Sequence, residues 1–136
     1  MSAQNLDHIC AEYGWEIAKQ VCEAIKQNPE NHIEKSLGVL QAHGVYAFFL
    51  YQESRGDRES DGAARLLSLA KELLEKAGIA TFRESNKESE VLSSIREGLA
   101  QNLDLLLLAK RLLEQALIYA RYHVKALEAK GNVENP

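Results

Sequence analysis

The chain has 136 residues, of which 46% are hydrophobic and 26% are charged, and its formal net charge at pH 7 is −4. A chain of this length buries one substantial core and is too short for two ordinary domains, so residues 1–136 are predicted to form a single domain. There is no run of about 18 uncharged apolar residues and no secretory signal pattern. We therefore expect a cytoplasmic protein without membrane contact.

The charge is unevenly distributed along the chain. Residues 1–60 contain five Lys or Arg against nine Asp or Glu, whereas residues 105–130 contain five basic residues against two acidic ones. The mild negative total argues against a protein whose whole surface binds nucleic acid. An anion-binding face is therefore expected near the C-terminal end.

The first half of the chain predicts three helices. Apolar residues recur at intervals of three and four from about residue 5 to residue 26, which is typical of an amphipathic helix. A second helix is predicted from the Asn28-Pro29 cap to His43, where Gly44 can adopt the left-handed conformation that ends helices. Residues 45–51 have the composition of a buried strand. We interpret them as a short buried helix, because a lone strand would leave its backbone groups unpaired.

The second half predicts two more helices before the last one. The polar segment 52–62 is predicted to be a loop. A helix is then predicted from residue 63 to residue 77, with Gly78 as its stop. The capping-box sequence SNKE at 85–88 predicts the start of another helix, which loosens near Gly98.

The last helix is predicted to be the longest, from about residue 102 to residue 129. Its inward face is predicted, from the helical spacing of apolar residues, to consist of Leu105, Leu108, Leu112, Ala116, Tyr119 or Ala120, His123 and Leu127. The predicted fold is all-α, a compact bundle of five to six helices with a long C-terminal helix.

No sequence pattern indicates catalysis or cofactor binding. The chain contains no glycine-rich phosphate loop, no HExxH, no GxSxG and no carboxylate cluster typical of a metal site. His123 is interpreted as a core histidine rather than a catalytic base. Cys10 and Cys22 would lie about 18 Å apart on one helix and are interpreted as reduced thiols. We expect no enzymatic activity, no metal and no cofactor.

The outer side of the last helix is predicted to combine basic and apolar side chains. At 100° per residue, Lys110, Arg121 and Lys125 fall within about 60° of one another, on the side away from the predicted core. A neighbouring stripe consists of Leu107, Arg111, Ile118 and Tyr122. Such a surface suits contact with a partner subunit, or with nucleic acid through phosphate pairing and stacking. The alternative is a charged solvent face with isolated apolar residues.

Three stretches, together with the opening helix, follow the order of features of a known family. They are SLGVLQAHGVYAFFLYQESR at 36–55, AARLLSLAKELLEKAGI at 63–79 and LLLLAKRLLEQALIYARYHVKALEA at 105–129. This order resembles the small helical subunit of the Cmr-type (type III-B) CRISPR effector complexes, which are RNA-guided. The family's Thr-x-Glu signature and its Trp followed by basic residues do not stand here in that form. Related small subunits of other type III complexes therefore remain an alternative.

The resemblance implies a non-catalytic subunit in antiviral defence, whose copies stack head to tail into a minor filament. Its partners would be copies of itself, other subunits of the CRISPR ribonucleoprotein and the target RNA paired with crRNA, with no small-molecule substrate. The residues implied for RNA binding are Lys110, Arg121 and Lys125, with Lys35, Arg55 and Arg58 as a second group. The residues implied for packing between subunits are Leu107, Arg111, Ile118 and Tyr122.

A second hypothesis from a different class is a helical adaptor. Such a protein would bind a protein partner through the same apolar stripe and would not contact nucleic acid. The net charge of −4 slightly favours this alternative.

Overall fold

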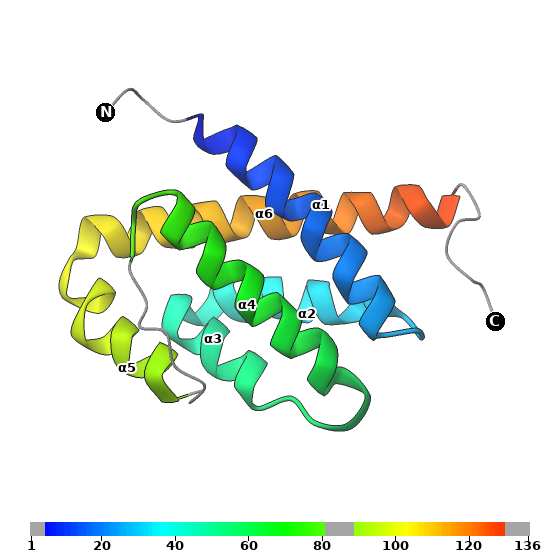
Figure 1. Cartoon of the computed structure of the whole chain (residues 1–136), viewed down its shortest axis with the longest axis horizontal. Coiled ribbons are helices and arrows are strands. Elements are labelled where there is room, and N and C mark those ends of the chain that lie inside the picture. Colours follow the sequence, from blue (N-terminus) through cyan, green and yellow to red (C-terminus); the bar gives the residue numbers. More distant parts are fainter. Residues whose placement is uncertain (1–4, 81–88, 130–136) are drawn as a thin grey trace.

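The computed structural model describes residues 5–80 and 89–129. These residues form α-helices and short 3₁₀ turns and include no strand. The elements are α1 (Leu6–Ala24), α2 (Pro29–His43), α3 (Val45–Glu53), η1 (Asp57–Glu59), α4 (Ser60–Lys76), α5 (Ser89–Glu97), η2 (Leu99–Gln101) and α6 (Leu103–Ala129). The predicted all-α bundle with a long C-terminal helix is confirmed, and α6 extends along most of the length of the molecule (Figure 1).

Helix α6 is the common surface against which much of the bundle packs. Its most extensive contact is with α1, which crosses over it, and α2 packs along a second side (Figure 1). Helix α4 packs mainly on α1 and α3, and α3 also contacts α2 and α5. A continuous core of buried aliphatic and aromatic side chains fills the space between these helices, with Phe48 and Phe49 of α3 fully buried. The short buried helix predicted over residues 45–51 is therefore confirmed.

The crossing of α1 and α6 is built from small residues. Gly14 and Ala18 of α1 and Ala116 and Ala120 of α6 are all buried, and Gly14 lies directly against Ala116 and Ala120. A Cβ atom placed on Gly14 would lie 2.6 Å from Cβ of Tyr119 and 3.0 Å from the carbonyl oxygen of Ala116. Any side chain at position 14 would therefore force the two helices apart.

Several helix boundaries follow the predicted turn chemistry. Gly44 and Gly78 have φ angles of +95° and +75°, in the region that glycine adopts without strain. Pro29 is the first residue of α2, although the side chain of Asn28 makes no capping hydrogen bond. The loop predicted at 52–62 is shorter, because α3 continues to Glu53 and η1 leads directly into α4 at Ser60. The capping box predicted at 85–88 lies outside the described residues.

The predicted inner face of α6 is partly wrong. The buried residues are Ala109, Leu112, Leu113, Ala116, Leu117, Ala120 and Val124. His123 and Leu127 are instead partly exposed, so His123 is not a core histidine. At 100° per residue, the buried arc is rotated by about 50° from the predicted one, toward the side that carries Lys110 and Lys125. The rotation arises because α2 covers that side of α6.

The tight crossing predicts opposite effects for two glycine substitutions. We expect Gly14→Ala to lower the free energy of unfolding by about 1–3 kcal/mol, because the new Cβ overlaps α6. Gly38→Ala in α2 is the matched control. Nothing lies within 4 Å of its Cβ position, so we expect it to raise stability by about 0.5–1 kcal/mol. Urea unfolding monitored by circular dichroism measures both changes; equal effects from the two variants would contradict a tight crossing.

Candidate nucleic-acid and subunit interface

The predicted basic residues of α6 face α2. Nζ of Lys125 lies 2.7 Å from Oε2 of Glu30, in the first turn of α2. At the other end, Nζ of Lys110 donates a hydrogen bond of 3.3 Å to the carbonyl oxygen of Gln41, near the end of α2. These two contacts show that α2 and α6 run antiparallel. We call the surface formed by Glu30, Glu34, Gln41, Lys110, Arg121 and Lys125 the α2–α6 seam.

Arg121 lies between the two lysines along α6 and belongs to the same surface. Its positive charge acts on the carboxylates of Glu30 and Glu34. Its Nε atom is buried and makes no hydrogen bond within the described residues, while its guanidinium lies 5.6 Å from the centre of the Tyr122 ring. The helical spacing therefore correctly grouped the three basic side chains on one side of α6. It did not reveal that α2 lies beside them.

Ion pairing changes the titration of the seam. The Lys125 ammonium donates to Glu30 and holds the pKa of that carboxyl below its ordinary value, and the same contact raises the pKa of Lys125. The neighbouring Glu30 carboxyl raises the pKa of Glu34. With both carboxylates ionised, the seam has three positive charges against two negative ones. It is therefore only weakly cationic.

The second predicted basic group lies around the α3–η1 connection. Nη1 of Arg55 is 3.7 Å from Oε1 of Glu59, and its guanidinium carbon is 4.2 Å from the centre of the Tyr51 ring. Nη1 of Arg58 donates a hydrogen bond of 2.9 Å to Oε1 of Gln27. Lys35 is exposed and, within the described part of the chain, forms no ion pair or hydrogen bond. Lys35 and Arg58 are thus the candidates least committed to charged partners.

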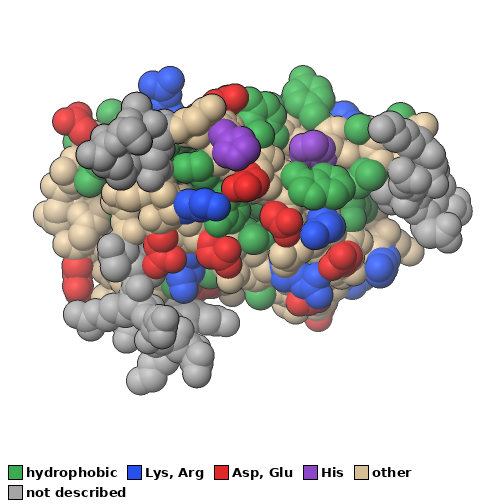
Figure 2. Space-filling view, turned by 45° about the horizontal axis from the view of Figure 1, so that its top comes forward, with side chains coloured by type: hydrophobic (Ala, Val, Ile, Leu, Met, Phe, Trp, Pro, Cys, Tyr) green, Lys and Arg blue, Asp and Glu red, His purple; other side chains and the backbone are tan. Residues whose placement is uncertain are grey.

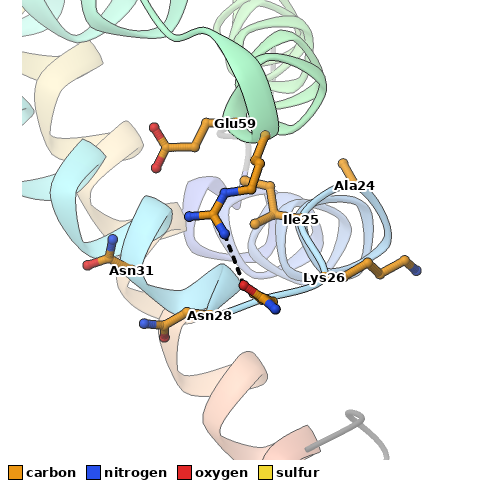
Figure 3. Close-up of a pocket in the computed structure, with 8 residues that line it drawn as sticks. Ala24, Ile25, Lys26, Asn28, Asn31 and Glu59 are labelled. Atoms are coloured by element: carbon orange, nitrogen blue, oxygen red, sulfur yellow. Dashed lines mark hydrogen bonds between the residues drawn. The ribbon is translucent and has the colours of Figure 1, made fainter. Parts of the chain in front are cut away.

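A pocket beside Arg58 was not predicted from the sequence. It has a volume of about 470 Å³ and is lined by Ala24, Ile25, Lys26, Gln27, Asn28, Asn31, Arg58 and Glu59. In Figure 3, Asn28 and Asn31 lie on one side of the pocket and Ile25 on the other, while the ammonium of Lys26 points away. Three side-chain amides and a guanidinium can form hydrogen bonds with base edges and phosphates. Sequence spacing missed this site because η1 lies 31 residues from Gln27 along the chain.

The predicted apolar stripe of α6 is only partly exposed. Leu107 and Tyr122 are 51% and 59% exposed, and Arg111 is exposed beside them. Ile118 is different, because it is partly buried and packs against the core. Leu103, at the start of α6, is 66% exposed and extends the apolar surface. Ile118, in the middle of the stripe, is therefore partly covered, whereas Leu107 and Tyr122 on either side of it remain exposed.

Helix α1 adds a further exposed aromatic side chain. Trp15 is 41% exposed, and its ring meets the His123 ring edge to face with 5.3 Å between the centroids. Figure 2 shows hydrophobic and histidine side chains on the face toward the viewer, with acidic and basic side chains close beside them. Exposed aromatic side chains are enriched in surfaces that contact partner proteins.

Residues 5–80 and 89–129 include no group of three or more His, Cys, Asp or Glu side chains arranged to hold a metal ion. None of their helices combines the length and apolarity that crossing a bilayer requires. Cys10 and Cys22 are free thiols, as interpreted from their spacing.

Comparison with models of protein families gives no match, and neither the curated proteins nor the solved structures include a significant one.

The Glu30–Lys125 pair predicts a pH dependence of stability. Because the pKa of Glu30 is lowered in the folded state, its stabilising contribution is present above its ordinary value of 4.5 and is lost as the pH falls below that value. We expect Glu30→Gln to unfold at lower urea concentration than the wild type at neutral pH, and we expect this difference to shrink toward about pH 3. Glu114→Gln is the control, since Glu114 forms no ion pair within the described residues. A constant difference across this range would contradict the assignment.

Proposed function

We propose that this chain is a non-catalytic subunit of a type III-B CRISPR effector complex, which stacks with copies of itself in a minor filament and helps hold target RNA for antiviral defence. The main support is the outer side of α6. Leu103, Leu107 and Tyr122 stay at least half exposed on a helix whose inner side is already covered by α1 and α2. Large apolar side chains on an otherwise satisfied helix favour contact with another macromolecule.

Head-to-tail stacking requires two different surfaces on each copy. The exposed side of α6 supplies one candidate. Trp15 on α1 and Leu50 on α3 are the remaining large apolar side chains that are strongly exposed in the described residues, and each lies outside α6. The presence of large exposed apolar side chains on three helices is compatible with a repeated heterologous contact.

Sequence-independent holding of RNA requires cations that can reach phosphates. Lys125 is paired with Glu30, so a phosphate would have to compete with a carboxylate, and Lys110 is bound to a backbone carbonyl of α2. Arg58, like Lys110, has a neutral partner, Gln27, but the pocket beside it offers further amide groups. We therefore favour the surface around Arg58, together with Lys35, as the principal RNA contact, rather than the α2–α6 seam.

Charge reversal tests the RNA contact in the assembled complex. We expect Arg58→Glu with Lys35→Glu to weaken target-RNA binding by about tenfold and to reduce the slope of log affinity against log salt by about one to two. Lys110→Glu with Lys125→Glu should have a smaller effect. Lys19→Glu, on an exposed residue of α1, is the control. Fluorescence anisotropy at several salt concentrations provides the measurement.

The apolar side of α6 makes a separate prediction about assembly. We expect Leu107→Asp with Tyr122→Asp to weaken association with neighbouring subunits by at least about tenfold, because a buried anchor would become a charged group. Ala64→Asp, at an exposed position of α4, is the control. Mass photometry of the reconstituted complex measures the loss. If assembly were unchanged while the monomers remained folded, the exposed stripe would not be the interface.

The alternative of an adaptor that does not bind RNA is favoured by one observation. The carboxylates of Glu30 and Glu34 lie beside the predicted α6 cations, which leaves the seam weakly charged. An adaptor predicts that the Leu107 and Tyr122 variants lose their partner, whereas none of the charge reversals alters RNA binding. The two experiments above therefore distinguish the hypotheses.

A further inference from the structure

The contact between α2 and α3 contains a buried polar cluster. His32 and Ser36 lie four residues apart on one face of α2, and Gln52 comes from the last turn of α3. The exposed fractions of the three side chains are only 1%, 0% and 3%. Polar groups this deeply buried are stable only when their hydrogen bonds are satisfied.

The hydrogen bonds place a proton on Nε2 of the histidine. Nε2 of Gln52 donates a bond of 2.9 Å to Oγ of Ser36, so the Gln52 oxygen is the atom that faces Nε2 of His32, also at 2.9 Å. The amide oxygen only accepts, and therefore Nε2 of His32 must carry the proton. Nδ1 of His32 is buried and has no hydrogen-bond partner within the described residues. The closed arrangement thus accommodates a ring protonated at Nε2 and offers no described partner for a second proton at Nδ1.

A second proton would disrupt this arrangement. It would place a charged N–H at Nδ1, where no described acceptor lies, in a site with almost no solvent contact. Burial is the main effect that lowers the pKa of His32 below its ordinary 6.5. Among the surrounding charged groups, Arg55 and Lys35 lower the pKa further, whereas Glu59 and the Gln52 hydrogen bond raise it.

The cluster is connected to the segment that follows α3. The His32 ring stacks on the Tyr51 ring with 6.1 Å between centroids and 22° between planes. The Arg55 guanidinium lies over that same Tyr51 ring, and Arg55 also pairs with Glu59 of η1. If His32 moves, the Tyr51 ring loses the ring on which it stacks. A shift of Tyr51 in turn weakens its contact with Arg55, and Arg55 pairs with Glu59 of η1.

We propose that the His32–Ser36–Gln52 cluster is a proton-sensitive latch, which holds α3 against α2 while His32 is neutral and releases the segment from Tyr51 to Glu59 when His32 binds a proton. Histidine is suited to this role because its charge changes close to physiological pH. The latch goes beyond the proposed function and does not depend on it, since it operates within one chain.

Amide hydrogen exchange of the full chain tests the latch directly. The backbone N–H groups of Ser54, Arg55 and Glu59 donate to backbone carbonyls within the segment. After correction for intrinsic rates, we expect their exchange to increase by about tenfold or more between about pH 7.5 and pH 5. Exchange in the buried middle of α6, at Leu113 and Leu117, should stay constant. Unchanged exchange in the segment, or an equal increase in α6, would overturn the proposal.

Two further measurements assign the effect to His32. The ring titration of His32, followed by NMR in the wild-type chain, should have its midpoint below 6.5; a midpoint at or above 6.5 would overturn the proposal.

Gln52→Glu supplies a carboxylate that stabilises the charged ring, so we expect the segment to stay protected at pH 5. His43→Gln, at the exposed end of α2, should leave the pH response of the segment unchanged. If His43→Gln removed the response, His32 would not be its origin.

Discussion

The close approach of α1 and α6 at Gly14 is the constraint on which the rest of the bundle depends. With no side chain at that position, the two backbones meet at Ala116 and Tyr119. The same crossing brings the Tyr119 hydroxyl to Asp7 and the Cys10 thiol to a carbonyl of α6. Helix α2 packs along another side of α6. This arrangement decides which residues of the longest helix remain available to partners.

Because α2 packs beside the basic residues of α6, these residues do not form an open cationic surface. Lys125 and Lys110 bind opposite ends of α2, so they help to hold the two helices antiparallel. A surface ion pair of this kind contributes modestly to stability, but it also neutralises charge that phosphates would otherwise attract. Basic residues that form no ion pair within the described part of the chain, such as Lys35 and Arg111, lie on different helices. This distribution fits a subunit that contacts RNA at a few points within an assembly.

The buried polar cluster has a different energetic role from the apolar core. Aliphatic contacts between α2 and α3 would hold the helices together without regard to pH, whereas the buried His32 ring bound to Gln52 has no described acceptor for a second proton at Nδ1. Such a cluster specifies the register of α3 on α2 and makes that register sensitive to protons. Its neighbours Tyr51 and Arg55 extend this sensitivity to the surface.

The sequence determined the helices, because apolar periodicity, Pro29, Gly44 and Gly78 act within a few residues of one another along the chain. It also grouped Lys110, Arg121 and Lys125 on one side of α6. The packing of the helices against one another places this side next to α2, buries part of Ile118, leaves His123 partly exposed and brings Arg58 to a pocket with Gln27. Helical spacing gives the relative directions of side chains on one helix. Helical spacing does not say which neighbouring helix covers each side. That depends on how closely the helix backbones can pack.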